Sequence, residues 1–259
     1  SPESIEKKIT SKTRLLTPVH FAGQPADMVK ISEIAKKNGL KVIEDAAHAI
    51  GSKYSDGSPI GNCLYSDLTI FSFHPVKTIT TGEGGAVTTN RKDLYDKVAL
   101  FRTHGITKDP ALLKKNDGGW YYEMQELGYN YRITEMQAAL GISQLKRLDW
   151  SIERRNEIAK KYDEAFKGTA VKTPFRAEGL VHAFHLYIIQ VDPEKRKGLY
   201  DFLRANNVYS QVLYIPAHTM PYYKQQGWKD GNMPVAEDYY TKCLVLPMFP
   251  TLTDEEQDW

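Results

Sequence analysis

The sequence predicts an α/β fold, with one layered domain that holds a largely parallel sheet and a smaller α+β domain after it. Two patterns predict this fold. Short apolar runs alternate with helical segments through the first half of the chain, as strands and covering helices do around a parallel sheet. After Pro174 the segments become shorter and more mixed. Since 259 residues are enough for one large or two smaller domains, we expect domains at 1–165 and 166–259.

The first half contains four expected strands and three expected helices. The strands are apolar runs at 14–19, 41–44, 68–73 and 85–89. The helices are at 27–38, 91–101 and 133–148. In the first helix Met28, Ile31 and Ile34 share one face, and Gly39 follows as a C-cap. This alternation indicates strand–helix units around one sheet.

The second half begins with a charged helical pattern over 149–166, which predicts a long connecting helix. Beyond it we expect strands at 185–191, 209–214 and 244–246, and helices at 193–205 and 238–242. Two long segments, 103–128 and 215–233, are rich in glycine and proline and are expected to be loops. Long irregular segments are often functional.

The charge balance and composition exclude several classes of protein. Lys and Arg number 34 against 32 Asp and Glu, for a net charge of +2, which is far from the basic footprint of a nucleic-acid-binding protein. No apolar run approaches the roughly 18 residues of a membrane span, and no leader peptide is visible. Cys63 and Cys243 form no CxxC pair, which indicates neither a metal knuckle nor a disulfide framework. These features predict a cytoplasmic protein.

Both ends of the chain have the pattern of a fragment. The first residue is Ser1 rather than Met, and Ser-Pro-Glu is typical of the first turn of a helix. At the other end Thr253 and Glu256 form a capping box, but the chain ends soon afterwards at Trp259. We therefore expect a piece of a longer protein. A naturally short, frayed terminus is the alternative.

Three residues in the first half are candidates for a catalytic site. Asp45 ends a strand, which is where α/β sheets bind ligands, although such acids are often helix caps. Ser72 lies near the end of another expected strand, and Lys77 follows that strand and precedes the glycine-rich run 82–85. A lysine becomes nucleophilic when desolvation or nearby positive charge lowers its pKa, whereas most loop lysines are solvated and the glycines could form only a tight turn. Together these residues indicate a pyridoxal phosphate site, which needs a Schiff-base lysine, an acid for the ring nitrogen and donors for the phosphate.

Ordered motifs run along nearly the whole chain, at 18–28, 42–49, 71–85, 102–105, 128–132, 214–218 and 246–249. In these motifs the chain resembles the DegT/DnrJ-type sugar-nucleotide aminotransferases, a branch of the fold-type I pyridoxal phosphate enzymes. The segment 74–85 is most similar to the PseC-like enzymes of pseudaminic acid synthesis. The resemblance implies a three-layer α/β/α large domain, incomplete over 1–165, and a smaller α+β domain, truncated, over 166–259.

The resemblance implies roles for five residues. Lys77 would be the Schiff-base lysine and would move the proton between the cofactor and the substrate carbon. Asp45 would pair with the pyridine nitrogen, and His48 would lie near the phenolic oxygen. Ser72 would bind the phosphate. Asn130 would reach the phosphate of the neighbouring subunit's cofactor, which implies a homodimer with shared sites.

Candidates for the substrate pocket are Arg132, Tyr214 and His218. Each has an alternative interpretation, respectively as a surface salt bridge, a core tyrosine and a loop histidine. Four further histidines in similar motifs are expected to be structural: His20, His74, His104 and His185. From the charge balance, the lack of a long apolar run and the cysteine spacing, we expect no metal and no nucleic-acid or membrane partner.

The implied reaction takes an amino group from glutamate and delivers it to C4 of a UDP-linked 4-keto-6-deoxy sugar, in two half-reactions with ping-pong kinetics. One alternative is a family dehydratase, in which histidine replaces the lysine, and Lys77 argues against it. Another is a non-catalytic regulatory relative or an inactive fragment, which the intact Asp45, Ser72 and Lys77 do not favour. The resemblance also implies a phosphate-binding turn and a ring-stacking aromatic before Ser1. The 259 residues alone are therefore expected to bind the cofactor weakly or not at all.

Overall fold

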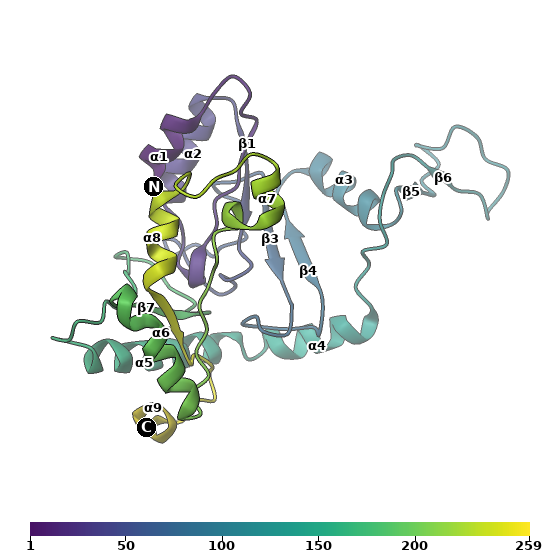
Figure 1. Cartoon of the computed structure of the whole chain (residues 1–259). Helices are drawn as coiled ribbons and strands as arrows, with labels where there is room; N and C mark the ends of the chain where they lie inside the picture. The colour runs from purple at the N-terminus through teal and green to yellow at the C-terminus, as the bar shows by residue number, and fades with distance from the viewer.

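The computed structural model describes all 259 residues, which form an α/β body and a long arm that projects from it (Figure 1). The body contains a four-stranded sheet in the order β1-β2-β3-β4. Its strands are β1 (Leu15–Leu16), β2 (Lys41–Asp45), β3 (Leu68–Ser72) and β4 (Gly85–Thr88). The first three run parallel and β4 runs antiparallel to β3, so the largely parallel sheet is confirmed.

The first strand is shorter than the expected run over 14–19. Only Leu15 and Leu16 pair with β2 as a strand, and Val19 adds one isolated bridge to Asp45. Pro18 lies between them, and proline has no N–H to donate to a neighbouring strand. The bridge still brings the segment after β1 to the end of β2, where Asp45 lies.

Two helices pack side by side next to this sheet, α1 (Pro2–Lys8) and α2 (Met28–Lys37) (Figure 1). Asp27 caps α2, because its carboxylate accepts the N–H of Lys30 at 3.3 Å. The expected apolar face of α2 is buried, with Met28 and Ile31 in one core cluster with Val42 of β2. Burial of a side chain of this size stabilises the fold by about 1.5–3 kcal/mol.

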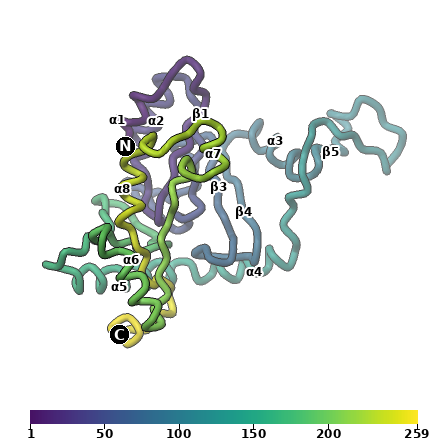
Figure 2. Tube along the Cα trace, in the orientation of Figure 1, coloured from purple at the N-terminus to yellow at the C-terminus, as the bar shows by residue number.

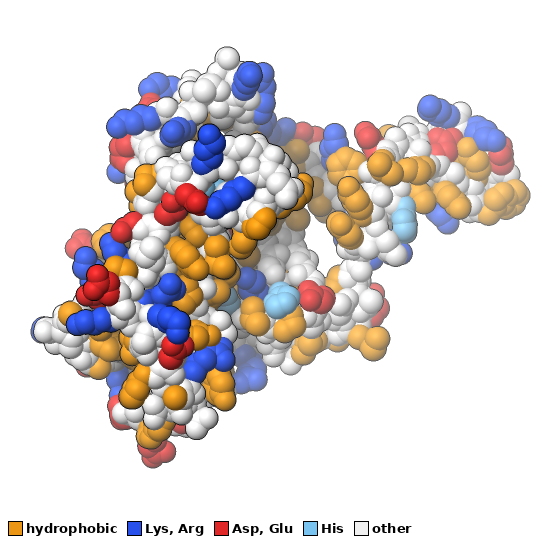
Figure 3. All heavy atoms as spheres, viewed as in Figure 1, with side chains coloured by type: hydrophobic (Ala, Val, Ile, Leu, Met, Phe, Trp, Pro, Cys, Tyr) orange, Lys and Arg blue, Asp and Glu red, His pale blue; other side chains and the backbone are white.

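An arm formed by residues 103–134 separates α3 (Lys92–Arg102) from α4 (Glu135–Leu145) (Figure 2). The loop expected over 103–128 contains a short antiparallel hairpin of β5 (Ile106–Thr107) and β6 (Glu123–Met124). Hydrophobic side chains cover much of the arm (Figure 3). Trp120 is 75% exposed, Leu127 78% and Tyr131 71%. Apolar surface of this extent is typical of an interaction site.

The second domain is built on an antiparallel pair of strands, β7 (Tyr187–Gln190) and β8 (Cys243–Leu246). Its helices are α5 (Leu148–Ala165), α6 (Pro193–Ala205), α7 (Pro221–Gln225), α8 (Pro234–Lys242) and α9 (Asp254–Asp258). One face of the pair packs Tyr187 and Leu244 against Ile158 of α5. The other face packs Ile188 against Ala22 of the first domain, so the two domains share apolar contacts.

Two expected elements of the second half are absent or begin elsewhere. The strand expected over 209–214 is absent, because this segment meets β8 at a single bridge between Gln211 and Val245 and a strand needs successive pairs. The helix expected at 238–242 begins earlier, at Pro234. The long helix is present as α5, and its Ile158, Ala159 and Tyr162 pack in the core of the second domain, so it is described with that domain. The domain boundary expected at 165/166 stays a prediction. None of the helices is both long enough and apolar enough to span a membrane.

Candidate active site

Asp45 lies at the carboxyl end of β2, and its backbone is hydrogen-bonded to the segment that follows β1. Its N–H donates to the carbonyl of Pro18 at 2.9 Å, and its carbonyl accepts the N–H of His20 at 3.0 Å. Its carboxylate accepts one hydrogen bond, from the N–H of Ala47 to Oδ1 at 3.0 Å, and Oδ2 has no protein donor. The backbone therefore fixes Asp45 while one carboxylate oxygen stays available.

Lys77 lies in the turn after β3, close to Ser72 at the end of that strand. Its N–H donates to the carbonyl of His74 at 2.9 Å, and its side chain is half-buried. Burial lowers the pKa of the Lys77 ammonium, and the nearby Asp45 carboxylate partly opposes this shift. Ser72 pairs with Gly85 of β4, where a Cβ would lie 2.7 Å from a backbone oxygen. Glycine is therefore needed where β4 approaches β3.

His48 lies in the turn after β2 and is 8% exposed. Burial and the charge of Lys77 lower the pKa of His48 to about 4, against the opposing effect of Asp45. The imidazole is therefore neutral at pH 7. Tyr214 of the second domain places its hydroxyl 3.3 Å from His48 Nε2, while His48 Nδ1 is buried without a hydrogen-bond partner. The structure thus brings together four of the predicted site residues: Asp45, His48, Lys77 and Tyr214.

Two aromatic residues join this group although the sequence analysis did not assign them to the site. His185, expected to be structural, has its ring centroid 4.5 Å from that of His48, and its Nδ1 is also buried without a partner. Phe21 lies with its ring centroid 6.3 Å from that of His48 and 6.4 Å from that of Tyr214. Phe21 lies in the motif at 18–28 and His185 begins the strand expected over 185–191, but neither position indicates a role at the site.

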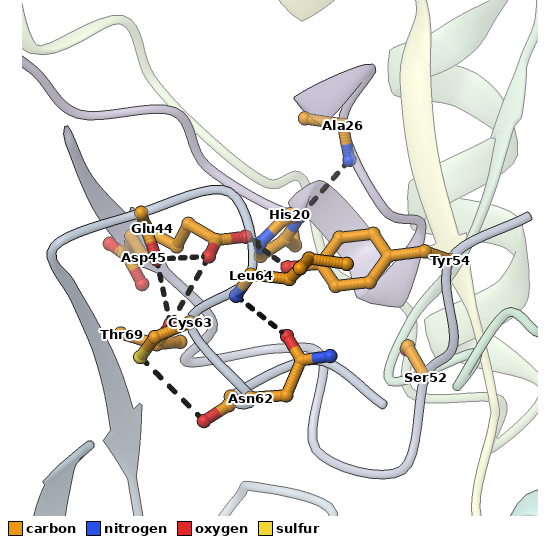
Figure 4. Close-up of polar contacts among 12 residues, drawn as sticks. His20, Ala26, Glu44, Asp45, Ser52, Tyr54, Asn62, Cys63, Leu64 and Thr69 are labelled. Carbon is orange, nitrogen blue, oxygen red and sulfur yellow. Dashed lines mark hydrogen bonds and ion pairs between the residues drawn. The ribbon is translucent and has the colours of Figure 1, made fainter. Parts of the chain in front are cut away.

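A buried carboxylate lies next to Asp45 in the sequence and anchors the same strand (Figure 4). Glu44 is fully buried, and His20 Nε2 lies 2.9 Å from its Oε2. Tyr54 also donates its hydroxyl to Glu44. The N–H of Ala26 donates to His20 Nδ1 at 3.0 Å, so the proton of a neutral His20 is on Nε2 and points to Glu44. His20 therefore links the network around Glu44 to the backbone of Asp45.

Three predicted residues lie apart from this group. Asn130 and Arg132 are exposed on the arm, where Asn130 forms an isolated bridge with Thr103. His218 is buried in the second domain, and its Nε2 lies 2.8 Å from Glu237 Oε1. No hydrogen bond, ion pair or ring contact joins these three residues to Lys77. Their roles stay predictions.

The residues around Lys77 fit pyridoxal phosphate. Lys77 offers an amine with a lowered pKa, and Asp45 offers a carboxylate oxygen without a protein donor. The Nδ1 of His48 is buried without a partner, which is costly unless a ligand atom meets it. Ser72 adds a half-buried hydroxyl at the end of the next strand. These are the groups that the aldehyde, ring nitrogen, phenolic oxygen and phosphate of this cofactor need.

Comparison with known proteins agrees with this chemistry. The chain is 40% identical to the spore coat polysaccharide biosynthesis protein SpsC of Bacillus subtilis, over 99% of this chain and 67% of that protein. It is 38% identical to GDP-perosamine synthase of Escherichia coli O157:H7, over 99% of this chain and 66% of that protein. The structure of Helicobacter pylori PseC, an aminotransferase involved in pseudaminic acid biosynthesis, is 31% identical, with a TM-score of 0.90 over 100% of this chain and 67% of that one.

The chain thus spans about two thirds of the length of these relatives. The sequence pattern of one family, the DegT/DnrJ/EryC1/StrS aminotransferases, matches residues 1–259. The predicted type I aminotransferase fold and the predicted cofactor are confirmed. The chain therefore belongs to the DegT/DnrJ/EryC1/StrS aminotransferase family and is that of a pyridoxal-phosphate-dependent sugar aminotransferase.

Proposed function

We propose that the full-length protein carrying this chain transfers the amino group of glutamate to C4 of a nucleotide-linked 4-keto-6-deoxy sugar. The product would enter the synthesis of pseudaminic acid or another surface glycan in the cytoplasm. The observation that carries the proposal is the half-buried Lys77 amine, with its lowered pKa, beside the Asp45 carboxylate and the neutral His48. These three groups meet the needs of amino transfer.

Lys77 would hold the cofactor and move the proton. When bound, pyridoxal phosphate supplies an electrophilic aldehyde carbon and a ring that withdraws electrons. Because burial lowers the pKa of Lys77, more of its amine is unprotonated near neutral pH than for a solvated lysine. Lys77 Nζ can therefore attack a carbonyl carbon, and after its release it can accept and return a proton.

The neighbouring side chains would orient the cofactor. The Asp45 carboxylate would hold a proton on the ring nitrogen through Oδ2, the oxygen that no protein group uses. The Nδ1 of His48 would face the phenolic oxygen, and the Ser72 hydroxyl would donate to the phosphate. Arg132, Tyr214 and His218 are the proposed contacts to the sugar nucleotide.

We further propose that the protein is a homodimer with shared sites. The exposed apolar side chains of the arm would pack against the second copy, and Asn130 on the arm would reach the phosphate in the partner's site. Sedimentation velocity of the full-length protein should give a dimer at micromolar concentration. A monomer that retains full activity would contradict shared sites.

A panel of substrates tests the reaction. The full-length protein is incubated with glutamate and with UDP-, dTDP- or GDP-linked 4-keto-6-deoxy sugars, and the products are identified by mass spectrometry. We expect an amino sugar from the UDP-linked substrate and none with Lys77→Ala. Lys172→Ala, which removes an exposed lysine outside the site, is the matched control and should keep wild-type turnover. Near wild-type turnover by Lys77→Ala, or a deoxy sugar without an amino group, would contradict the proposal.

A further inference from the structure

The histidines His48 and His185 form a buried pair that joins the two domains at the site. His48 follows β2 of the first domain, and His185 precedes β7 of the second. Their ring centroids are 4.5 Å apart with an angle of 38° between the ring planes. Both side chains are more than nine-tenths buried, and the Nδ1 of each lacks a partner. Neither nitrogen serves the stability of the fold through a hydrogen bond.

The backbone that carries His185 is fixed to the first domain. Val181 and Lys53 exchange two backbone hydrogen bonds of 3.1 Å. The N–H of Ala183 donates to the carbonyl of Gly23 at 3.1 Å, and Ser52 Oγ lies within 3.2 Å of the same nitrogen. These contacts hold the segment before β7 against the turn that contains His48.

The same segment is also fixed to the second domain. Phe184 has a φ of +42°, a conformation that a bulky residue keeps only when its surroundings impose it. The buried Arg155 of α5 donates to the carbonyls of Phe184 at 2.9 Å and His185 at 3.4 Å. It also donates to the carbonyl of Met248 at 2.9 Å. The position of the His185 ring is thus determined from both domains.

Burial, supported by the positive charges around the pair, keeps both rings neutral. Burial, the neighbouring His48, and the charges of Lys77 and Arg155 lower the pKa of His185 to about 2. His48 faces Lys77, Asp45 and the hydroxyl of Tyr214, and its own pKa is lowered to about 4. A neutral imidazole has one N–H donor and one acceptor nitrogen, so the orientation of its ring decides which nitrogen meets a ligand.

We propose that His185 is a positioning residue of the active site, which acts through His48 by packing against its ring and holding it in one orientation beside Lys77. His185 thereby couples the second domain to the site. The proposal rests on the proposed role of the Lys77 site. It requires a ring at position 185 and not a second titrating group.

The test measures the state of His48 directly, in the full-length protein without cofactor. Imidazole nitrogens are observed by ¹⁵N NMR between pH 5 and 8, with His48→Gln to assign the signal. In the wild type we expect His48 to stay neutral in a single tautomer. In His185→Ala the apparent pKa of His48 should rise by more than about one unit, toward the ordinary value near 6.5, and both tautomers should appear.

Two further variants separate packing from general damage. His185→Phe restores a ring and should return His48 to its wild-type behaviour. His182→Asn is the matched control. It removes a buried ring of the same segment, which stacks on Phe184 with centroids 3.7 Å apart, but keeps an oxygen that can accept the N–H of Phe184, as His182 Nδ1 does at 2.8 Å. It should leave His48 unchanged. If His185→Ala does not fold, His185→Gln removes the ring with the same expectation.

Activity gives the second measurement. In the loaded enzyme, the acid limb of the pH profile of kcat/KM should move upward in His185→Ala by the same amount as the pKa of His48. An unchanged His48 signal in His185→Ala, or a His185→Phe variant that behaves like it, would overturn the proposal. If Lys77 of the wild type carries no cofactor, the proposed function fails, whereas the NMR comparison still tests His185.

Discussion

Replacing Glu44 with glutamine tests the network that anchors the strand of Asp45. The Glu44 carboxylate accepts from His20 Nε2 at 2.9 Å and from Thr69 at 3.2 Å. The hydroxyls of Tyr54 and Ser66 donate to it as well. Desolvation opposes the charge of Glu44, but these donors outweigh it and lower the pKa of the carboxyl group. Glu44 is therefore ionised at pH 7 with its oxygens satisfied.

The loss of stability in Glu44→Gln depends on which of the groups that donate hydrogen bonds to Glu44 can accept one instead. His20 cannot, because its Nδ1 accepts the N–H of Ala26. The amide oxygen must therefore face His20 and Tyr54, and the amide NH₂ must face hydroxyls that can act as acceptors. No donor is left unpaired, but the hydrogen bonds lose the carboxylate charge, and we expect a loss of about 2 kcal/mol. Glu44→Leu leaves both His20 and Tyr54 unpaired and should cost roughly 4 kcal/mol.

Thermal unfolding of the full-length variants measures these effects. At pH 7 we expect the Tm of Glu44→Gln to fall by roughly 2–3 °C in the full-length protein and that of Glu44→Leu by more. The folded-state pKa of Glu44 is lower than its ordinary value of 4.5, so its contribution is complete above that value and is lost as the pH falls through the folded pKa. Glu44→Gln should therefore lose less stability than the wild type on acidification. A variant as stable as the wild type at pH 7, with the same acid response, would refute the reasoning.

Three further predictions concern the site, the arm and the assembly. Asp45→Asn should fold normally but lower turnover on the order of 100-fold, because a neutral amide cannot hold the proton on the ring nitrogen. Single-turnover kinetics measures this loss, and unchanged kinetics would remove Asp45 from the site. Gly105→Ala should make the base of the arm susceptible to proteolysis, because the new Cβ would lie 1.8 Å from the carbonyl oxygen of Glu126. Gly168 also has a positive φ, but a Cβ there meets no atom, so Gly168→Ala should lower the free energy of unfolding by only about 1 kcal/mol. Leu127→Asp should shift sedimentation from dimer to monomer, and an unaffected dimer would place the interface elsewhere.

Local patterns predicted the elements whose determinants lie close together in the sequence. The face formed by Met28 and Ile31 predicted α2, and the capping box of Thr253 and Glu256 predicted α9. The strand predicted over 209–214 was wrong because the residues of a segment do not reveal whether a neighbouring strand edge is available along its length. Only the tertiary structure shows that Gln211 meets β8 at one point.

The resemblance could suggest roles for single residues of the site, but it could not show which residues contact one another. Tyr214 and His48 are separated by 166 positions, and their contact exists only in the fold. His20 and Glu44 are 24 positions apart, and nothing in their spacing indicates a buried pair. His185 was expected to be structural, and only the fold shows that its ring lies against that of His48.

The central claim is that Lys77 carries the cofactor, and borohydride reduction tests it most directly. The full-length protein is loaded with pyridoxal phosphate, reduced, digested and mapped by mass spectrometry. We predict a phosphopyridoxyl group on the peptide that contains Lys77 and its loss in Lys77→Ala. A stable adduct on another lysine, or bound cofactor that leaves Lys77 unmodified after reduction, would contradict the account.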